Sequence, residues 1–212
     1  MIAMKKRILI LYAKTGGGHR SLALALSEVL QSNPDVDVSL FDPFPQGVEK
    51  SYEVFGSSLR FLWGLIWHLT NSRLLSFIAA FPSKVFLYPK LARKFREIKP
   101  DVVVTNHPLL CSGLRRVLHK AQCDQTKIVV HVADPFTLHA VWFSSPDSDM
   151  FLLPTEQTKK LAISYGVPPT SCEVVGWLLR SQFLSGSKRA TYQTELPYVF
   201  IGSGGQGGGN TF

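Results

Sequence analysis

Short runs of apolar residues alternate along this chain with longer segments whose apolar residues recur at helical spacing. The apolar runs predict strands over residues 8–12, 36–41, 127–132 and 150–153, and residues 101–108 predict a further strand that ends in a polar loop. The longer segments predict helices over residues 21–31, 52–80, 84–97, 111–121 and 157–165, the last with Thr155 as its N-cap. Apolar strands that alternate with helices are typical of a parallel sheet covered on both faces. The pattern therefore predicts an α/β fold with a Rossmann-like parallel sheet.

A glycine turn follows the first predicted strand and leads directly into the first predicted helix. Gly16, Gly17 and Gly18 precede His19, and Ser21 takes the place of the third glycine of a dinucleotide-binding fingerprint. A P-loop is excluded as well, because the last glycine is not followed by Lys and then Ser or Thr. An imidazole at the mouth of such a turn suits a site that transfers protons, unless it only caps the helix.

Two further polar clusters follow predicted strands, and they contain His107 and Asp134. Parallel sheets bind ligands at the carboxyl ends of their strands, so both residues are candidates for a site that includes His19. Asp134 could orient a protonated imidazole, or it could cap a local turn before Pro135. Trp142, at the end of the second loop, is more typical of a core residue than of a ligand platform.

The net charge of +8 is concentrated in one part of the chain. Residues 60–99 hold eight basic side chains and one acidic side chain, interleaved with tryptophan and aliphatic residues. A basic segment suits a polyanion, and this apolar content favours an anionic membrane surface over nucleic acid. We expect the membrane to be contacted by Arg60, Trp63, Trp67 and Arg73, and we expect no nucleic-acid partner.

Other features of the chain narrow the class of protein. The apolar stretch 61–81 is interrupted by polar residues and is too broken for a transmembrane helix, and no signal peptide is recognisable. We therefore expect a peripheral membrane protein at the cytoplasmic face. Three scattered cysteines indicate reduced thiols, and no cluster of Cys and His predicts a metal site.

The composition of the sequence changes after the last predicted helix. Residues 181–196 are mostly polar and predict a linker. Residues 197–212 predict a strand followed by a glycine loop with the spacing GxGxxG. This loop is either a flexible glycine-rich end or the start of a second α/β unit. In the second case we expect Gly204, Gly205 and Gly207 to bind a phosphate group.

Four segments of the chain carry a family pattern: residues 16–20 (GGGHR), 100–108 (PDVVVTNHP), 134–142 (DPFTLHAVW) and 174–180 (VVGWLLR). Together they resemble the monogalactosyldiacylglycerol synthases and processive diacylglycerol glucosyltransferases, over nearly the whole chain. The resemblance implies the N-terminal half of a glycosyltransferase with the GT-B architecture. It implies an acceptor-binding domain over 1–180, a linker over 181–196 and the first strand and glycine loop of a donor-binding domain over 197–212.

The resemblance also implies an activity, namely transfer of glucose or galactose from a UDP-sugar to diacylglycerol with inversion and without a cofactor. His19 and Asp134 would be catalytic, with His19 as the general base at the acceptor hydroxyl or as the group that orients this base. The acceptor site would contain Gly17, Gly18, His107, His139 and Trp142. One departure is Ala133, where the family usually has Thr before the aspartate.

The family's donor-binding residues lie beyond residue 212. We therefore expect the 212-residue chain to be inactive by itself. The alternative function is that of a non-catalytic domain, or fragment, that binds lipid at a membrane surface.

Overall fold

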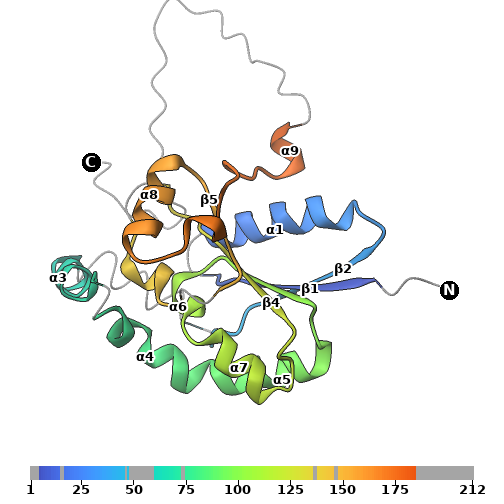
Figure 1. Cartoon of the computed structure of the whole chain (residues 1–212), viewed down its shortest axis with the longest axis horizontal. Coiled ribbons are helices and arrows are strands. Elements are labelled where there is room, and N and C mark those ends of the chain that lie inside the picture. Colours follow the sequence, from blue (N-terminus) through green and yellow to red (C-terminus); the bar gives the residue numbers. More distant parts are fainter. Residues whose placement is uncertain are drawn as a thin grey trace, which may run out of the picture.

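A computed structural model describes residues 5–14, 17–45, 47, 60–72, 75–135, 138–145 and 148–184. In this part of the chain six strands form one parallel sheet in the order β2-β1-β3-β4-β5-β6 (Figure 1). The strands are β1 Lys6–Leu11, β2 Val36–Phe41, β3 Val102–Thr105, β4 Lys127–His131, β5 Met150–Leu153 and β6 Cys172–Val174. The predicted strands and the parallel sheet are therefore confirmed, two of the strands with the predicted bounds.

The order of the strands reverses at β1. Ile10 of β1 pairs with Leu40 of β2 on one side and with Val104 of β3 on the other. The chain therefore adds β2 on one side of β1, and then adds β3 to β6 on the other side. At such a switch point the loops after the two central strands diverge and leave a crevice for a ligand. We therefore expect a ligand site at the loops that follow β1 and β3.

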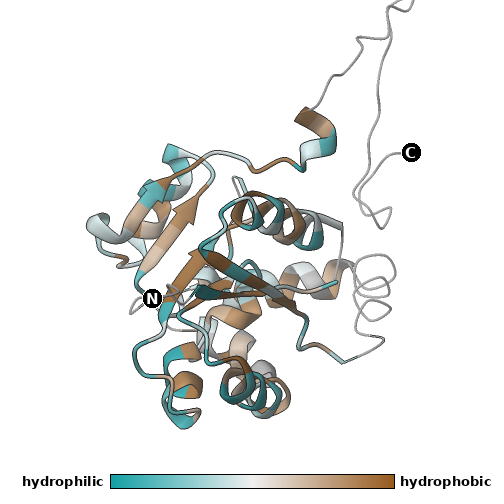
Figure 2. Ribbon diagram, turned by 90° about the vertical axis from the view of Figure 1, so that its right-hand side faces the viewer, coloured by the Kyte–Doolittle hydropathy of each residue, from teal (hydrophilic) through white to brown (hydrophobic). Residues whose placement is uncertain are grey.

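Helices cover both faces of the sheet (Figure 1). Helix α1, Gly17–Gln31, lies on one face, where Ala23 and Leu26 pack against β1 and β3. Helices α5, Tyr88–Ile98, and α7, Leu114–Lys120, lie on the opposite face over the largest buried cluster. Figure 2 shows the result, in which apolar strands lie between helices whose outer residues are hydrophilic.

The remaining described elements are short. They are α3 Arg60–Thr70, α4 Ser76–Phe86, α6 Pro108–Cys111, η1 Ala140–Phe143, α8 Glu156–Ser164, η2 Pro169–Ser171 and α9 Ser181–Leu184. Within the described part of the chain, none of the helices is long and apolar enough to cross a bilayer. Helix α9 occupies the first four residues of the predicted linker, and the rest of that linker and residues 197–212 lie outside the described residues.

The first residues of two helices can be compared with the sequence prediction. Helix α8 begins as predicted, since the Thr155 hydroxyl accepts a hydrogen bond from the Thr158 N–H at 3.1 Å. Helix α1 begins at Gly17 instead of residue 21, so the glycine turn runs into its first helical turn. His19 is therefore a helical residue near the N-terminus of α1, not a loop residue that precedes the helix.

Two predicted helices are each divided in two. The described part of the predicted helix 52–80 is interrupted near Ser72, whose hydroxyl accepts a hydrogen bond from the Leu75 N–H at 3.1 Å. The predicted helix 111–121 is interrupted at Gly113, which has a φ of +71°. A Cβ at Gly113 would also collide with the Tyr88 hydroxyl, so the position requires glycine on two grounds.

Candidate active site

His19 and Asn106 meet at the switch point of the sheet. His19 lies in the first turn of α1, and Asn106 directly follows β3. The His19 ring bonds through Nδ1 to the Asn106 main-chain oxygen at 2.6 Å, and the Asn106 side-chain amide donates to the His19 main-chain oxygen at 2.7 Å. A carbonyl oxygen only accepts, so the hydrogen of neutral His19 resides on Nδ1. The Nε2 atom then keeps its lone pair.

The environment of His19 keeps this imidazole neutral. Burial lowers the pKa of His19, while the charge of Asp134 and the bond to the Asn106 carbonyl raise it in part. Since the net pKa lies below the ordinary value of 6.5, the lone pair on Nε2 is available at neutral pH. The chemistry that this geometry allows is acceptance of a proton by Nε2.

His107 packs directly against His19. The centroids of the two rings are 4.7 Å apart, and Phe44 lies edge-on to the His107 ring at 5.0 Å. The Nδ1 atom of His107 accepts a hydrogen bond from the Leu109 N–H at 3.3 Å and so caps helix α6. Burial, and secondarily the neighbouring His19, hold the pKa of His107 well below its usual range. His107 is thus a neutral side chain that lines the site.

Asp134 is held by the indole of Trp142. The Trp142 Nε1–H donates to Asp134 Oδ2 at 2.8 Å, and the indole centroid lies 6.2 Å from that of His19. Trp142 has no exposed surface, in agreement with its interpretation as a core residue. The partner that orients His19 at Nδ1 is the Asn106 carbonyl, so Asp134 acts on the imidazole through its charge. The sequence did not reveal either the Asn106 contact or the pairing of Asp134 with Trp142.

His139 joins the site loop to helix α3. Its Nδ1 accepts a hydrogen bond from the Val141 N–H at 3.2 Å, which leaves Nε2–H to donate to Thr70 Oγ1 at 3.0 Å. The Trp67 ring lies edge-on to His139 at 5.4 Å, and Asn71 Oδ1 accepts from the Ala140 N–H at 2.8 Å. Both nitrogens of His139 are therefore engaged, and α3 is fixed to the loop that carries Trp142.

The first two residues of α1 are open to solvent. A Cβ added at Gly17 or Gly18 would meet no atom within 4 Å, and neither residue has a positive φ. Neither steric crowding nor backbone conformation explains glycine at these positions. An open helix N-terminus suits an anionic or polar ligand group, because its first N–H groups have no partner within the helix.

Several predicted site residues cannot be placed. Arg60 and Trp63 belong to α3, but their side chains lie outside the described residues. Arg73 and the three glycines Gly204, Gly205 and Gly207 also lie outside them. Their proposed contacts with membrane and donor stay predictions. Where the structure is described, no group of three or more His, Cys, Asp or Glu is arranged to hold a metal ion.

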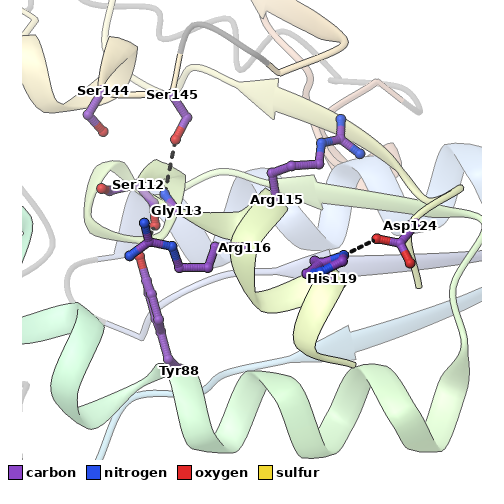
Figure 3. Close-up of a pocket in the computed structure, with 9 residues that line it drawn as sticks. All are labelled: Tyr88, Ser112, Gly113, Arg115, Arg116, His119, Asp124, Ser144 and Ser145. Atoms are coloured by element: carbon purple, nitrogen blue, oxygen red, sulfur yellow. Dashed lines mark hydrogen bonds and ion pairs between the residues drawn. The ribbon is translucent and has the colours of Figure 1, made fainter. Parts of the chain in front are cut away.

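A cavity of about 560 Å³ lies apart from the His19 site, beside α5 and α7 (Figure 3). Two of its polar side chains have partners within the protein, since Arg115 pairs with Asp149 at 2.6 Å and His119 contacts Asp124 at 2.6 Å. The lining residues are Tyr88, Ser112, Gly113, Arg115, Arg116, His119, Asp124, Ser144 and Ser145. None of the residues around His19 contributes to it, so we place the candidate site at the switch point.

A parallel α/β sheet with helices on both faces defines a Rossmann-like domain, and the partly buried His19 at its switch point marks the candidate site. Residues 23–178 match the family described as "Monogalactosyldiacylglycerol (MGDG) synthase". This match covers most of the chain, and the chain therefore belongs to the MGDG synthase family.

Relatives from plants are similar over nearly all of the chain. The monogalactosyldiacylglycerol synthase of Spinacia oleracea is 26% identical over 220 residues, which cover 96% of this chain and 42% of the relative. The probable monogalactosyldiacylglycerol synthase 3 of Oryza sativa subsp. japonica is 29% identical over 224 residues, which cover 96% and 43%. The chain thus spans less than half the length of these relatives.

Among solved structures, the apo form of the lipopolysaccharide outer core galactosyltransferase WaaB is similar, with a TM-score of 0.49 and 16% sequence identity. The similarity covers 81% of this chain and 45% of that structure. A likeness of this strength carries no argument about the site.

Proposed function

We propose that this chain is the acceptor-binding part of a glycosyltransferase that transfers a hexose from a UDP-sugar to diacylglycerol. One observation carries the proposal: His19 lies partly buried at the switch point, with Nδ1–H bound to a carbonyl and with Nε2 unprotonated. Membership of the MGDG synthase family supports the acceptor and the class of donor. The names of the relatives favour galactose over glucose as the sugar.

In the proposed mechanism, His19 is the general base. Its Nε2 takes the proton of the acceptor hydroxyl while the hydroxyl oxygen forms a bond to the anomeric carbon of the sugar. The bond from that carbon to UDP breaks on the opposite side, and UDP leaves with the electron pair, so the configuration inverts. The carboxylate of Asp134, held by Trp142, stabilises the imidazolium that forms.

The acceptor is proposed to approach from a lipid surface along α3 and α4. Both helices expose large apolar side chains, and His139 fixes α3 to the loop that carries Trp142. No helix in the described part of the chain spans a bilayer, so contact with a surface is the mode of attachment that we propose. The cytoplasmic face and an anionic surface follow from the basic charge of residues 60–99.

Donor binding is proposed to need residues outside this acceptor-binding part, with no cofactor. The chain corresponds to 42% of the spinach relative, and inverting transfer needs a second binding surface opposite His19. We therefore propose that the 212 residues alone do not turn over. We propose that residues 1–180 bind the acceptor and that Gly204, Gly205 and Gly207 contact a donor phosphate.

The acceptor site can be tested on this chain without sugar transfer. Phosphatidylcholine nanodiscs with diacylglycerol should shift the His19 ring signals in NMR spectra, whereas nanodiscs without diacylglycerol should not. The exposed His119 serves as an internal control whose signals stay in place. If His19 responds equally to both preparations, or to neither, the chain has no acceptor site at His19. The non-catalytic lipid-binding function would then be the better account.

A further inference from the structure

Asn106 is joined to His19 by two hydrogen bonds that run in opposite directions. The Asn106 side-chain Nδ2 donates to the His19 main-chain oxygen at 2.7 Å. The His19 Nδ1–H donates to the Asn106 main-chain oxygen at 2.6 Å. The side chain therefore fixes the main chain of His19, and the main chain of Asn106 fixes the ring.

Burial of the Asn106 side chain lowers the stability of the fold. It is 1% exposed, and its Oδ1 has no hydrogen-bond partner among the described residues. A buried polar atom without a partner destabilises a fold, and a leucine of similar size would avoid this penalty. Such exceptions to hydrogen-bond pairing call for a functional explanation. Here the visible effect of the side chain is its hold on His19.

The two bonds together select one tautomer of His19. A free neutral histidine side chain favours the hydrogen on Nε2, which would leave no lone pair there to accept a proton. The Asn106 carbonyl imposes the opposite tautomer, with the hydrogen on Nδ1. This selection requires that the ring stay within hydrogen-bond distance of that carbonyl.

We propose that Asn106 is a positioning residue for proton transfer by His19. Its amide holds the first turn of α1 so that the imidazole keeps Nδ1–H on the Asn106 carbonyl and directs Nε2 at the acceptor hydroxyl. The proposal rests on the proposed role of His19 as general base. The charged or titratable groups that face His19 are Asp134 and His107, and both stay in place in the variants below.

The test is the tautomer of His19, measured by ¹⁵N NMR of the ring nitrogens in the 212-residue chain. In the parent protein Nδ1 should show the chemical shift of a protonated nitrogen and Nε2 that of an unprotonated one. In Asn106→Leu the two shifts should move toward each other, because the ring is released and both tautomers are populated. Asn106→Ala is a second variant that removes the amide without adding volume. A folded variant that keeps the parent's tautomer overturns the proposal.

His131 supplies a matched control on the neighbouring strand. Thr105 of β3 pairs with Val130 of β4, so His131 lies one position further at the same edge as Asn106. His131 is 2% exposed and its Nδ1 also has no partner among the described residues, but it makes no hydrogen bond to His19 there. His131→Phe should leave the His19 tautomer unchanged. It should also raise the midpoint of thermal unfolding, because it removes a buried Nδ1 atom that has no hydrogen-bond partner among the described residues.

If His131→Phe changes the His19 tautomer as much as Asn106→Leu does, the specific role of Asn106 is overturned. The effect would then belong to any change of polarity at this edge of the sheet. The tautomer of His19 is measured without the sugar donor and without diacylglycerol. A failure of diacylglycerol binding would therefore contradict the proposed function and leave the measurement on Asn106 intact.

Discussion

The pKa of His19 results from opposing effects of its neighbours. Burial lowers this pKa most, while Asp134 and the Asn106 carbonyl raise it in part. A general base needs a pKa below the working pH to be unprotonated, yet high enough to attract the proton in the transition state. At this site burial supplies the first property, and the charge of Asp134 supplies the second.

Asp134→Asn should therefore lower the pKa of His19 further. The amide keeps the size of the side chain and can still accept the Trp142 N–H, but it removes the charge that favours the imidazolium. The measurement is an NMR titration of the His19 ring between pH 4 and pH 8. In a protein competent for transfer, the acidic limb of kcat/KM should move to lower pH in the same direction. Asp124→Asn, in the turn that follows α7, is the control and should leave the pKa of His19 unchanged. A His19 pKa that stays or rises in Asp134→Asn contradicts the assigned role.

Sequence reasoning located the polar residues of the site but not their contacts. His19, His107 and Asp134 could be predicted because each follows an apolar strand of a parallel sheet. Asn106 was missed, although it lies directly between a predicted strand and His107. A strand pattern gives the end of the strand, but it does not tell which atoms of neighbouring loops come within hydrogen-bond distance. For the same reason the bond between Asp134 and Trp142 could not be predicted.

Helix α3 combines an exposed apolar face with a fixed attachment to the site loop. Five of its large apolar residues are more than two-fifths exposed, with Phe61 at 87% and Leu69 at 60%. In contrast, Trp67 is partly buried, and its ring packs on His139. Trp67 was predicted to contact the membrane from composition alone. Its position shows that replacing it would also disturb the contact between α3 and the loop.

The docking surface should therefore be tested on the outer face of α3. Phe61→Asp combined with Leu65→Asp should weaken binding to anionic vesicles by about tenfold or more, because two large apolar side chains leave the lipid surface. The measurement is co-sedimentation with vesicles of phosphatidylcholine and phosphatidylglycerol. Val29→Asp changes an exposed apolar residue on α1, and this variant should bind as the parent does. Unchanged binding of the α3 variant would show that another surface contacts the membrane.

At the scale of the whole molecule, the fold connects the exposed apolar helix α3 to the proposed general base His19. Helix α3 is bonded to His139, the loop continues into η1, Trp142 of η1 holds Asp134, and Asp134 acts on His19. Two of these steps join residues far apart in the sequence, namely Thr70 with His139 and Asp134 with His19. Asp134 and Trp142 lie close together in the sequence. In the proposed function, these contacts link the surface that would bind lipid to the switch point of the sheet.

The overall fold was the most predictable level. Apolar strands and helical spacing determine a parallel α/β sheet, because only burial on both faces accommodates such strands. The division of the helices was less predictable. It depends on local contacts, such as the Ser72 turn and the approach of Tyr88 to Gly113, that hydrophobic spacing does not encode.

The central claim is that His19 is the general base for transfer to the acceptor. The most direct measurement is the rate of hexose transfer from UDP-galactose to diacylglycerol, in a protein of the relatives' length that contains this sequence. His19→Ala should lower kcat by about 10²–10⁴-fold while the protein stays folded. His119→Ala, at an exposed histidine of α7, should retain the parent rate. A His19→Ala rate close to that of the parent would contradict the account.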